Sequence, residues 1–373
     1  MSVIHHHDGH CPLEVCPLLI RLKIRLQSSL KKHIPYMLWY SHAARHIRSL
    51  TNEPNTRFRP APSTYPHFTS TAITMAPQTP AQSKAPLKVL MLHGYTQSGP
   101  LFRAKTRALE KHLKKSFPLH AITLSYPTGP LHLSPSDIPD FQPSSTASTE
   151  ANDADQPECY AWWRRSSTAN PPEYVGLDEG FEAVARVLAE EGPFDGVFGF
   201  SQGAAFAAIV ASLLEPERKA SFKYFADIKR NSNTPVLPSD AGDPATGIAF
   251  PASFENLTHP PFKFAICYSG FIAPGARYRA FYERPKIQTP VLHVLGSLDA
   301  IVEEARSRML ISACEGDAEK EGKVIWHPGG HFLPSQRPYL DAAVRFIREC
   351  LEQVDKQTGD GLEEKVEDME MPF

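Results

Sequence analysis

The chain has 373 residues, which is enough for one large domain or two of modest size. Hydrophobic residues make up 42% of it, the formal net charge is -2 and no apolar run reaches membrane-spanning length, so composition indicates neither a nucleic-acid partner nor a membrane span. The six cysteines are scattered, with no CxxC pair and no metal-ligand spacing, so we expect reduced thiols and no bound metal.

Residues 1–84 differ in composition from the rest of the chain. Arg, Lys and His are frequent before residue 73, where only three acidic residues occur, and residues 57–84 are rich in Ser, Thr and Pro. Two interpretations remain open. Residues 1–74 are an Arg-rich mitochondrial transit peptide, or the stretch is a disordered or non-native extension with translation beginning at Met75. We expect a cytoplasmic protein, or a mitochondrial one under the first interpretation.

A globular domain is predicted at 85–352, because apolar runs alternate there with amphipathic segments. In chain order we expect a strand at 88–93, a helix at 102–113, a strand at 121–126, an irregular segment at 127–157, a helix at 177–190, a strand at 194–200, a helix at 202–214, an irregular segment at 215–261, strands at 264–268 and 291–295, a helix at 303–313, a strand at 323–326 and a helix at 334–351. Residues 353–373 are mostly polar and acidic and are predicted to be a solvated tail. Strands that alternate with helices predict an α/β fold, a mainly parallel sheet with helices on both faces.

The pentapeptide GFSQG at 199–203 carries the main chemical signal. The pattern GxSxG marks a nucleophilic serine when it ends a buried strand and opens a helix, as it does here. The turn would hold the hydroxyl of Ser201 above the sheet, where the small residues Gly199 and Gly203 leave room for it. The alternative interpretation is that Ser201 only caps the following helix.

A serine nucleophile needs a base, and in α/β-hydrolases the acid and the histidine follow the serine in that order. His331 lies in HPGGHFLP, after the last predicted strand and before the last helix, and is the expected base. His327 is the rival, but it stands at the strand end. Asp299 follows an apolar strand and is the expected acid, which would orient the imidazole. The alternative is that Asp299 caps the next helix or shapes a turn.

Two backbone N–H groups are needed to stabilise the oxyanion that forms during acyl transfer. One is expected from Gln202, the residue after the nucleophile, and the other from Tyr95 in the loop LHGYTQS after the first strand. His93 precedes the serine in the chain and is expected to brace this loop.

Together these motifs resemble the fungal serine hydrolase family known as FSH, which is related to the human ovarian-tumour-associated esterase. The resemblance covers roughly residues 87–351. It rests on LHGYTQSG, Trp-Trp at 162–163, GFSQG, ICYSGF at 266–271, VLHVLG at 291–296 leading to Asp299, and HPGGHFLP. It implies an α/β-hydrolase fold, a triad of Ser201, Asp299 and His331, and no metal or nucleotide cofactor. Residues 1–84 and the two irregular segments depart from the family pattern.

We therefore expect a cofactor-free serine hydrolase that cleaves small acyl esters or thioesters through an acyl-enzyme intermediate. The resemblance implies one alternative, a thioesterase that releases acyl or polyketide chains in fungal secondary metabolism, with an acyl carrier protein as partner. A hypothesis of another class is a non-catalytic binding module on a hydrolase fold, which the intact triad argues against. A dinucleotide site is not expected, because no GxGxxG follows the first strand.

Overall fold

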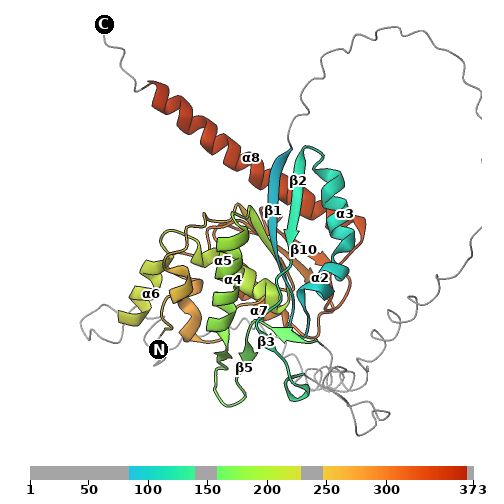
Figure 1. The fold of residues 1–373 in the computed structure, drawn as a ribbon, viewed down its shortest axis with the longest axis vertical. Helices are drawn as coiled ribbons and strands as arrows, with labels where there is room; N and C mark the ends of the chain where they lie inside the picture. Colours follow the sequence, from blue (N-terminus) through green and yellow to red (C-terminus); the bar gives the residue numbers. More distant parts are fainter. Residues whose placement is uncertain (1–83, 139–157, 228–246, 368–373) are drawn as a thin grey trace, which may run out of the picture. The chain divides into compact units, whose positions relative to one another are not determined.

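The computed structural model describes residues 84–138, 158–227 and 247–367 of the chain (Figure 1). The predicted extension at 1–84 lies outside these residues except for its last position, as do parts of both predicted irregular segments. Within the described ranges, no helix is long and apolar enough to cross a membrane.

The domain is built on a six-stranded sheet with the strand order β10-β9-β8-β7-β1-β2. Every neighbouring pair in it is parallel, which confirms the predicted parallel sheet. The strands are β1 (Ala85–Leu92), β2 (His120–Ser125), β7 (Gly196–Phe200), β8 (Phe264–Tyr268), β9 (Val291–Gly296) and β10 (Val324–His327). Two short antiparallel pairs lie outside the sheet, β3 (Leu131–His132) with β4 (Tyr160–Ala161) and β5 (Arg164–Arg165) with β6 (Tyr174–Val175).

Helices cover both faces of the sheet (Figure 1). They are α2 (Gly99–Lys105), α3 (Arg107–Ser116), α4 (Leu177–Glu191), α5 (Gln202–Leu213), α6 (Arg218–Asp227), α7 (Glu304–Ser312) and α8 (Arg337–Glu367), with 3-10 turns η2 (Pro135–Asp137), η4 (Ala252–Phe254) and η5 (Ala276–Phe281). Leu90 and Leu92 of β1 pack in the cluster that includes α4 and α5, whereas Val89 and Met91 pack with α2, α3 and α8. Successive side chains of a strand point to opposite faces, so the single apolar run of β1 contributes to two cores.

Three helices differ from the sequence prediction. The predicted helix at 102–113 is two helices, because the hydroxyl of Thr106 donates to the Phe102 carbonyl, 3.0 Å away, and the backbone turns there. Helix α6 forms inside the predicted irregular segment 215–261, where it buries Phe222 and Phe225. Helix α8 runs on to Glu367, into residues predicted to be a tail, whose frequent Glu, Lys and Gln are good helix formers.

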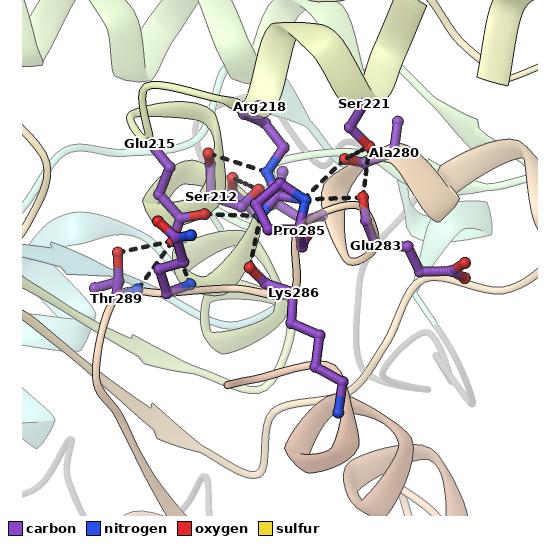
Figure 2. Close-up of polar contacts among 11 residues, drawn as sticks. Ser212, Glu215, Arg218, Ser221, Ala280, Glu283, Pro285, Lys286 and Thr289 are labelled. Atoms are coloured by element: carbon purple, nitrogen blue, oxygen red, sulfur yellow. Dashed lines mark hydrogen bonds and ion pairs between the residues drawn. The ribbon is translucent and has the colours of Figure 1, made fainter. Parts of the chain in front are cut away.

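A buried ion pair fixes the segment that enters β9 (Figure 2). The guanidinium of Arg218 is fully buried and lies 2.7 Å from the carboxylate of Glu215. The other oxygen of Glu215 accepts hydrogen bonds from the backbone N–H groups of Gln288 and Thr289. Arg218 also donates to the carbonyls of Ser212, Ala280, Glu283, Pro285 and Lys286. Helix α6 is thereby tied to residues 280–289, which lead directly into β9.

Candidate active site

The turn between β7 and α5 holds Ser201 in an unusual backbone conformation. Its φ is 54° and its ψ is -116°, in a region that residues other than glycine rarely adopt. The neighbouring glycines are required by sterics. A Cβ at Gly199 would lie 2.1 Å from the carbonyl oxygen of Gly203, and a Cβ at Gly203 would lie 2.1 Å from that of Leu92. Both contacts are with backbone, so a side chain at either position would displace the turn.

The structure brings Ser201, His331 and Asp299 into one hydrogen-bonded chain. His331 Nε2 lies 2.9 Å from Ser201 Oγ, and His331 Nδ1 lies 2.8 Å from Asp299 Oδ2. A carboxylate only accepts hydrogen bonds, so Nδ1 carries the proton and Nε2 is free to accept from the serine hydroxyl. The three side chains come from the loops that follow β10, β7 and β9, at the carboxyl edge of the sheet.

Asp299 both shapes its own loop and faces His331. One of its carboxylate oxygens accepts the N–H groups of Ile301 and Val302, each at 2.9 Å, so the turn-forming role considered for it is also present. Burial opposes ionisation of the carboxyl, but the hydrogen bond from His331 and these two N–H donors outweigh it and lower the pKa of Asp299 to about 2. The carboxylate is therefore charged at neutral pH.

His327, the rival base, lies outside the hydrogen bonds that join Ser201, His331 and Asp299. Its side chain is buried, its ring packs against the rings of Phe332 and Tyr339, and its Nε2 has no hydrogen-bond partner among the described residues. Burial lowers its pKa. These surroundings are those of a core side chain that supports the loop bearing His331.

The two backbone N–H groups expected to face the oxyanion donate no hydrogen bond within the described part of the chain. Gln202 is the first residue of α5, whose opening N–H groups have no partner within the helix, and neither its N–H nor that of Tyr95 donates to an acceptor in the described part of the chain. The side chain of Tyr95 is anchored elsewhere, because its hydroxyl donates to the Asp137 carbonyl at 2.8 Å.

His93 makes the bracing contacts that the sequence predicts. Its Nδ1–H donates to the carbonyl of Gly94, its Nε2 accepts the N–H of Gly129, both at 2.8 Å, and its own carbonyl accepts the indole N–H of Trp162. Burial lowers the pKa of His93 to about 4, so the ring is neutral near pH 7. One nitrogen can therefore donate while the other accepts.

The side chain of Gln202 has a role that sequence reasoning missed. Its Oε1 accepts the N–H of Trp162 and its Nε2 donates to the carbonyl of Trp163, at 2.9 and 2.8 Å. The ring of Trp163 in turn stacks on Tyr174, which stacks on Tyr278. Gln202 thus connects the stacked rings of Trp163, Tyr174 and Tyr278 to the turn at Ser201. In the sequence the Trp-Trp pair at 162–163 stands out, but nothing there identifies Gln202 as its partner.

Among the described His, Cys, Asp and Glu side chains, no group of three or more is placed so that it could hold a metal ion.

Comparison with known proteins adds a family to this geometry. The family model described as "Serine hydrolase (FSH1)" matches residues 82–343. The chain is 33% identical over 258 residues to a Schizosaccharomyces pombe protein named dihydrofolate reductase, covering 68% of this chain but only 45% of that one. It is 33% identical over 275 residues to Esterase OVCA2 of Danio rerio, covering 71% of this chain and 99% of the relative.

Among solved structures, Zea mays acyl-protein thioesterase 2 aligns with 73% of this chain and 97% of its own, at 18% identity and a TM-score of 0.42. The parallel sheet, the turn at Ser201 and the family match confirm the predicted α/β-hydrolase fold. The chain belongs to the FSH1 family of serine hydrolases.

Proposed function

We propose that the chain hydrolyses carboxylic esters, with Ser201 as nucleophile, His331 as general base and acid, and Asp299 as the residue that orients His331. The observation that carries this proposal is the unbroken chain of hydrogen bonds from Asp299 through His331 to Ser201. A protein that only binds a ligand would not require this chain of hydrogen bonds.

The reaction begins when His331 Nε2 takes the hydroxyl proton as Ser201 Oγ bonds to the ester carbonyl carbon. The carbonyl oxygen becomes an oxyanion, and in this proposal the N–H groups of Tyr95 and Gln202 stabilise it. His331 then gives its proton to the leaving alcohol, and the carbon–oxygen bond to that alcohol breaks. Water, deprotonated by His331, hydrolyses the acyl-enzyme and restores Ser201. The same steps release a thiol from a thioester.

Asp299 supports these steps by its charge. With a pKa lowered to about 2 it is ionised whenever His331 becomes protonated, so it stabilises the imidazolium that forms in both halves of the reaction. It also holds the proton of neutral His331 on Nδ1, which leaves Nε2 facing the serine.

Labelling with a fluorophosphonate tests the nucleophile. We expect wild type to be labelled once and Ser201→Ala not to be labelled, because the phosphonate bonds to the activated serine oxygen. Ser297→Ala is the matched control, since Ser297 is exposed on the loop that also carries Asp299. Labelling of Ser201→Ala at the wild-type rate would show that another residue is the nucleophile.

The base is tested by ester turnover. His331→Ala should lower kcat/KM for a p-nitrophenyl ester by roughly 10³-fold or more, since the serine loses its proton acceptor. His327→Gln, checked for folding by circular dichroism, should keep most of the activity. The opposite ranking would transfer the role of base to His327.

A further inference from the structure

We propose that Leu298, Ile301 and Phe332 form an apolar rim that binds the leaving group, so that preferred substrates carry an apolar alcohol or thiol. This inference rests on the proposed function and adds the substrate class to it. The rim would select substrates by the chain length of the leaving group and not by that of the acyl group.

Seven large apolar side chains are exposed among the described residues, and three of them lie next to the acid or the base in the chain. Leu298 is 72% exposed, Ile301 is 47% and Phe332 is 38%. Leu298 and Ile301 flank Asp299, and Phe332 follows His331 directly. Exposed apolar groups that cluster, rather than occurring singly, mark surfaces that bind apolar partners.

The two loops that carry the rim are joined to each other. The N–H of Leu298 donates to the carbonyl of Gly329 at 3.0 Å, and the ring of Phe332 packs over Gly329 so closely that a Cβ there would lie 2.3 Å from it. The N–H of Ile301 donates to the Asp299 carboxylate. The two loops that carry the rim are therefore held together beside the acid and the base.

The order of the strands determines which end of the substrate meets this surface. Ser201 follows β7, and the loop of Tyr95 follows β1, the neighbour of β7 on one side. Asp299 and His331 follow β9 and β10, which lie beyond β8 on the other side. The carbonyl oxygen must face the N–H of Tyr95, whereas the leaving oxygen must come within hydrogen-bond reach of His331 to receive its proton. The leaving group therefore extends toward the rim.

Two series of esters separate the leaving group from the acyl group. Methyl, butyl and octyl acetate lengthen the alcohol, and methyl acetate, butyrate and octanoate lengthen the acyl chain. The quantity to measure is kcat/KM, which reports the steps up to formation of the acyl-enzyme and so includes departure of the alcohol. Each methylene buried on the rim should raise it by up to about fourfold.

The test variant is the double substitution Leu298→Ser/Ile301→Ser. Phe332 is left in place because its ring also packs against His327. The matched control is Leu119→Ser, which removes a leucine that is 76% exposed just before the start of β2, at the opposite edge of the sheet from Ser201.

For the double variant we expect kcat/KM to fall about tenfold on octyl acetate and far less on methyl acetate. The ratio between methyl octanoate and methyl acetate should stay that of wild type, and Leu119→Ser should follow wild type in both series. An unchanged alcohol series, or a loss confined to the acyl series, overturns the inference. If wild type hydrolyses no ester and Ser201 takes no label, the proposed function itself fails.

Discussion

His93 follows β1 and His331 follows β10, and the different surroundings of the two imidazoles give them different chemistry. His331 is partly exposed and lies between a hydroxyl and a carboxylate. His93 is fully enclosed, with both ring nitrogens engaged by backbone. A proton added to Nε2 of His93 would remove the acceptor of the Gly129 N–H, so this ring works only in its neutral form.

His93 is expected to make the stability of the fold depend on pH. Its folded-state pKa of about 4 lies below the ordinary value of 6.5, so the unfolded chain binds the proton more readily. Its contribution, up to about 3 kcal/mol, is fully present above pH 6.5 and is lost as the pH falls toward 4. In His93→Leu, the fall in the free energy of unfolding between pH 7 and pH 4 should be shallower than in wild type, measured by urea denaturation.

A histidine on the surface provides the control for this experiment. His132 is exposed, so His132→Leu leaves the contacts of His93 in place and should keep the pH dependence that His93 contributes. An identical slope for His93→Leu and wild type would mean that His93 accepts a proton in the folded protein. At pH 7, His93→Leu should itself be destabilised by about 1–3 kcal/mol, since it leaves the buried N–H of Gly129 unpaired.

Single residues differ in how far the sequence predicts their place. The GxSxG motif and the chain order of serine, acid and histidine select Ser201, Asp299 and His331, because each follows a strand that a short apolar run predicts. The hydrogen bonds of Gln202 to Trp162 and Trp163 could not be predicted, because they join segments about 40 residues apart and a glutamine amide has no preferred partner.

At the scale of elements, the sequence predicts the long segments with a clear apolar pattern. It does not predict the two-residue strands or helix α6. The central strands read as apolar runs because both faces of a parallel sheet are buried. The strands of the pairs β3–β4 and β5–β6 have two residues each and are stabilised by pairing with each other. Two residues are too few to show a strand pattern in the sequence. Helix α6 escaped prediction because its neighbours in sequence are rich in proline and asparagine, and packing decides its conformation.

The ion pair of Arg218 and Glu215 should be worth far more than an exposed pair (Figure 2). Arg218→Met leaves a buried carboxylate without its partner and several carbonyls without a donor, and we expect a loss of about 3–5 kcal/mol. Arg308→Met is the control. It removes ion pairs with Glu304 and Glu319 in which every side chain is about half exposed, and should lower the free energy of unfolding far less than Arg218→Met does.

Urea denaturation of both variants checks the prediction, with the midpoint and slope fitted separately. Equal losses for the two arginines would mean that the buried pair contributes no more than a surface pair. Because residues 280–289 lead into β9, esterase activity of Arg218→Met should decline at lower urea concentrations than in wild type.

For the whole molecule, the thiols report whether the domain is intact. Cys159, Cys267, Cys314 and Cys350 are free and buried, and burial raises the pKa of Cys314 and of Cys350 to about 12, so their reactive thiolate forms are scarce at neutral pH. In a variant with Cys11→Ser and Cys16→Ser, we expect all four to resist dithionitrobenzoate until guanidinium unfolds the chain. Fast labelling of Cys267 or Cys314 in the native state would reveal local opening of the core beside α5.

The three side chains of the proposed triad are brought together from distant parts of the chain, since Ser201 and His331 are 130 residues apart. During synthesis, the strand and turn that carry Ser201 emerge long before the loop that carries His331. A chain terminated between α5 and β10 therefore has the serine but not the base. Hydrolytic activity in a growing polypeptide should appear only once nearly the whole domain has been made, so that truncated products are inert toward esters.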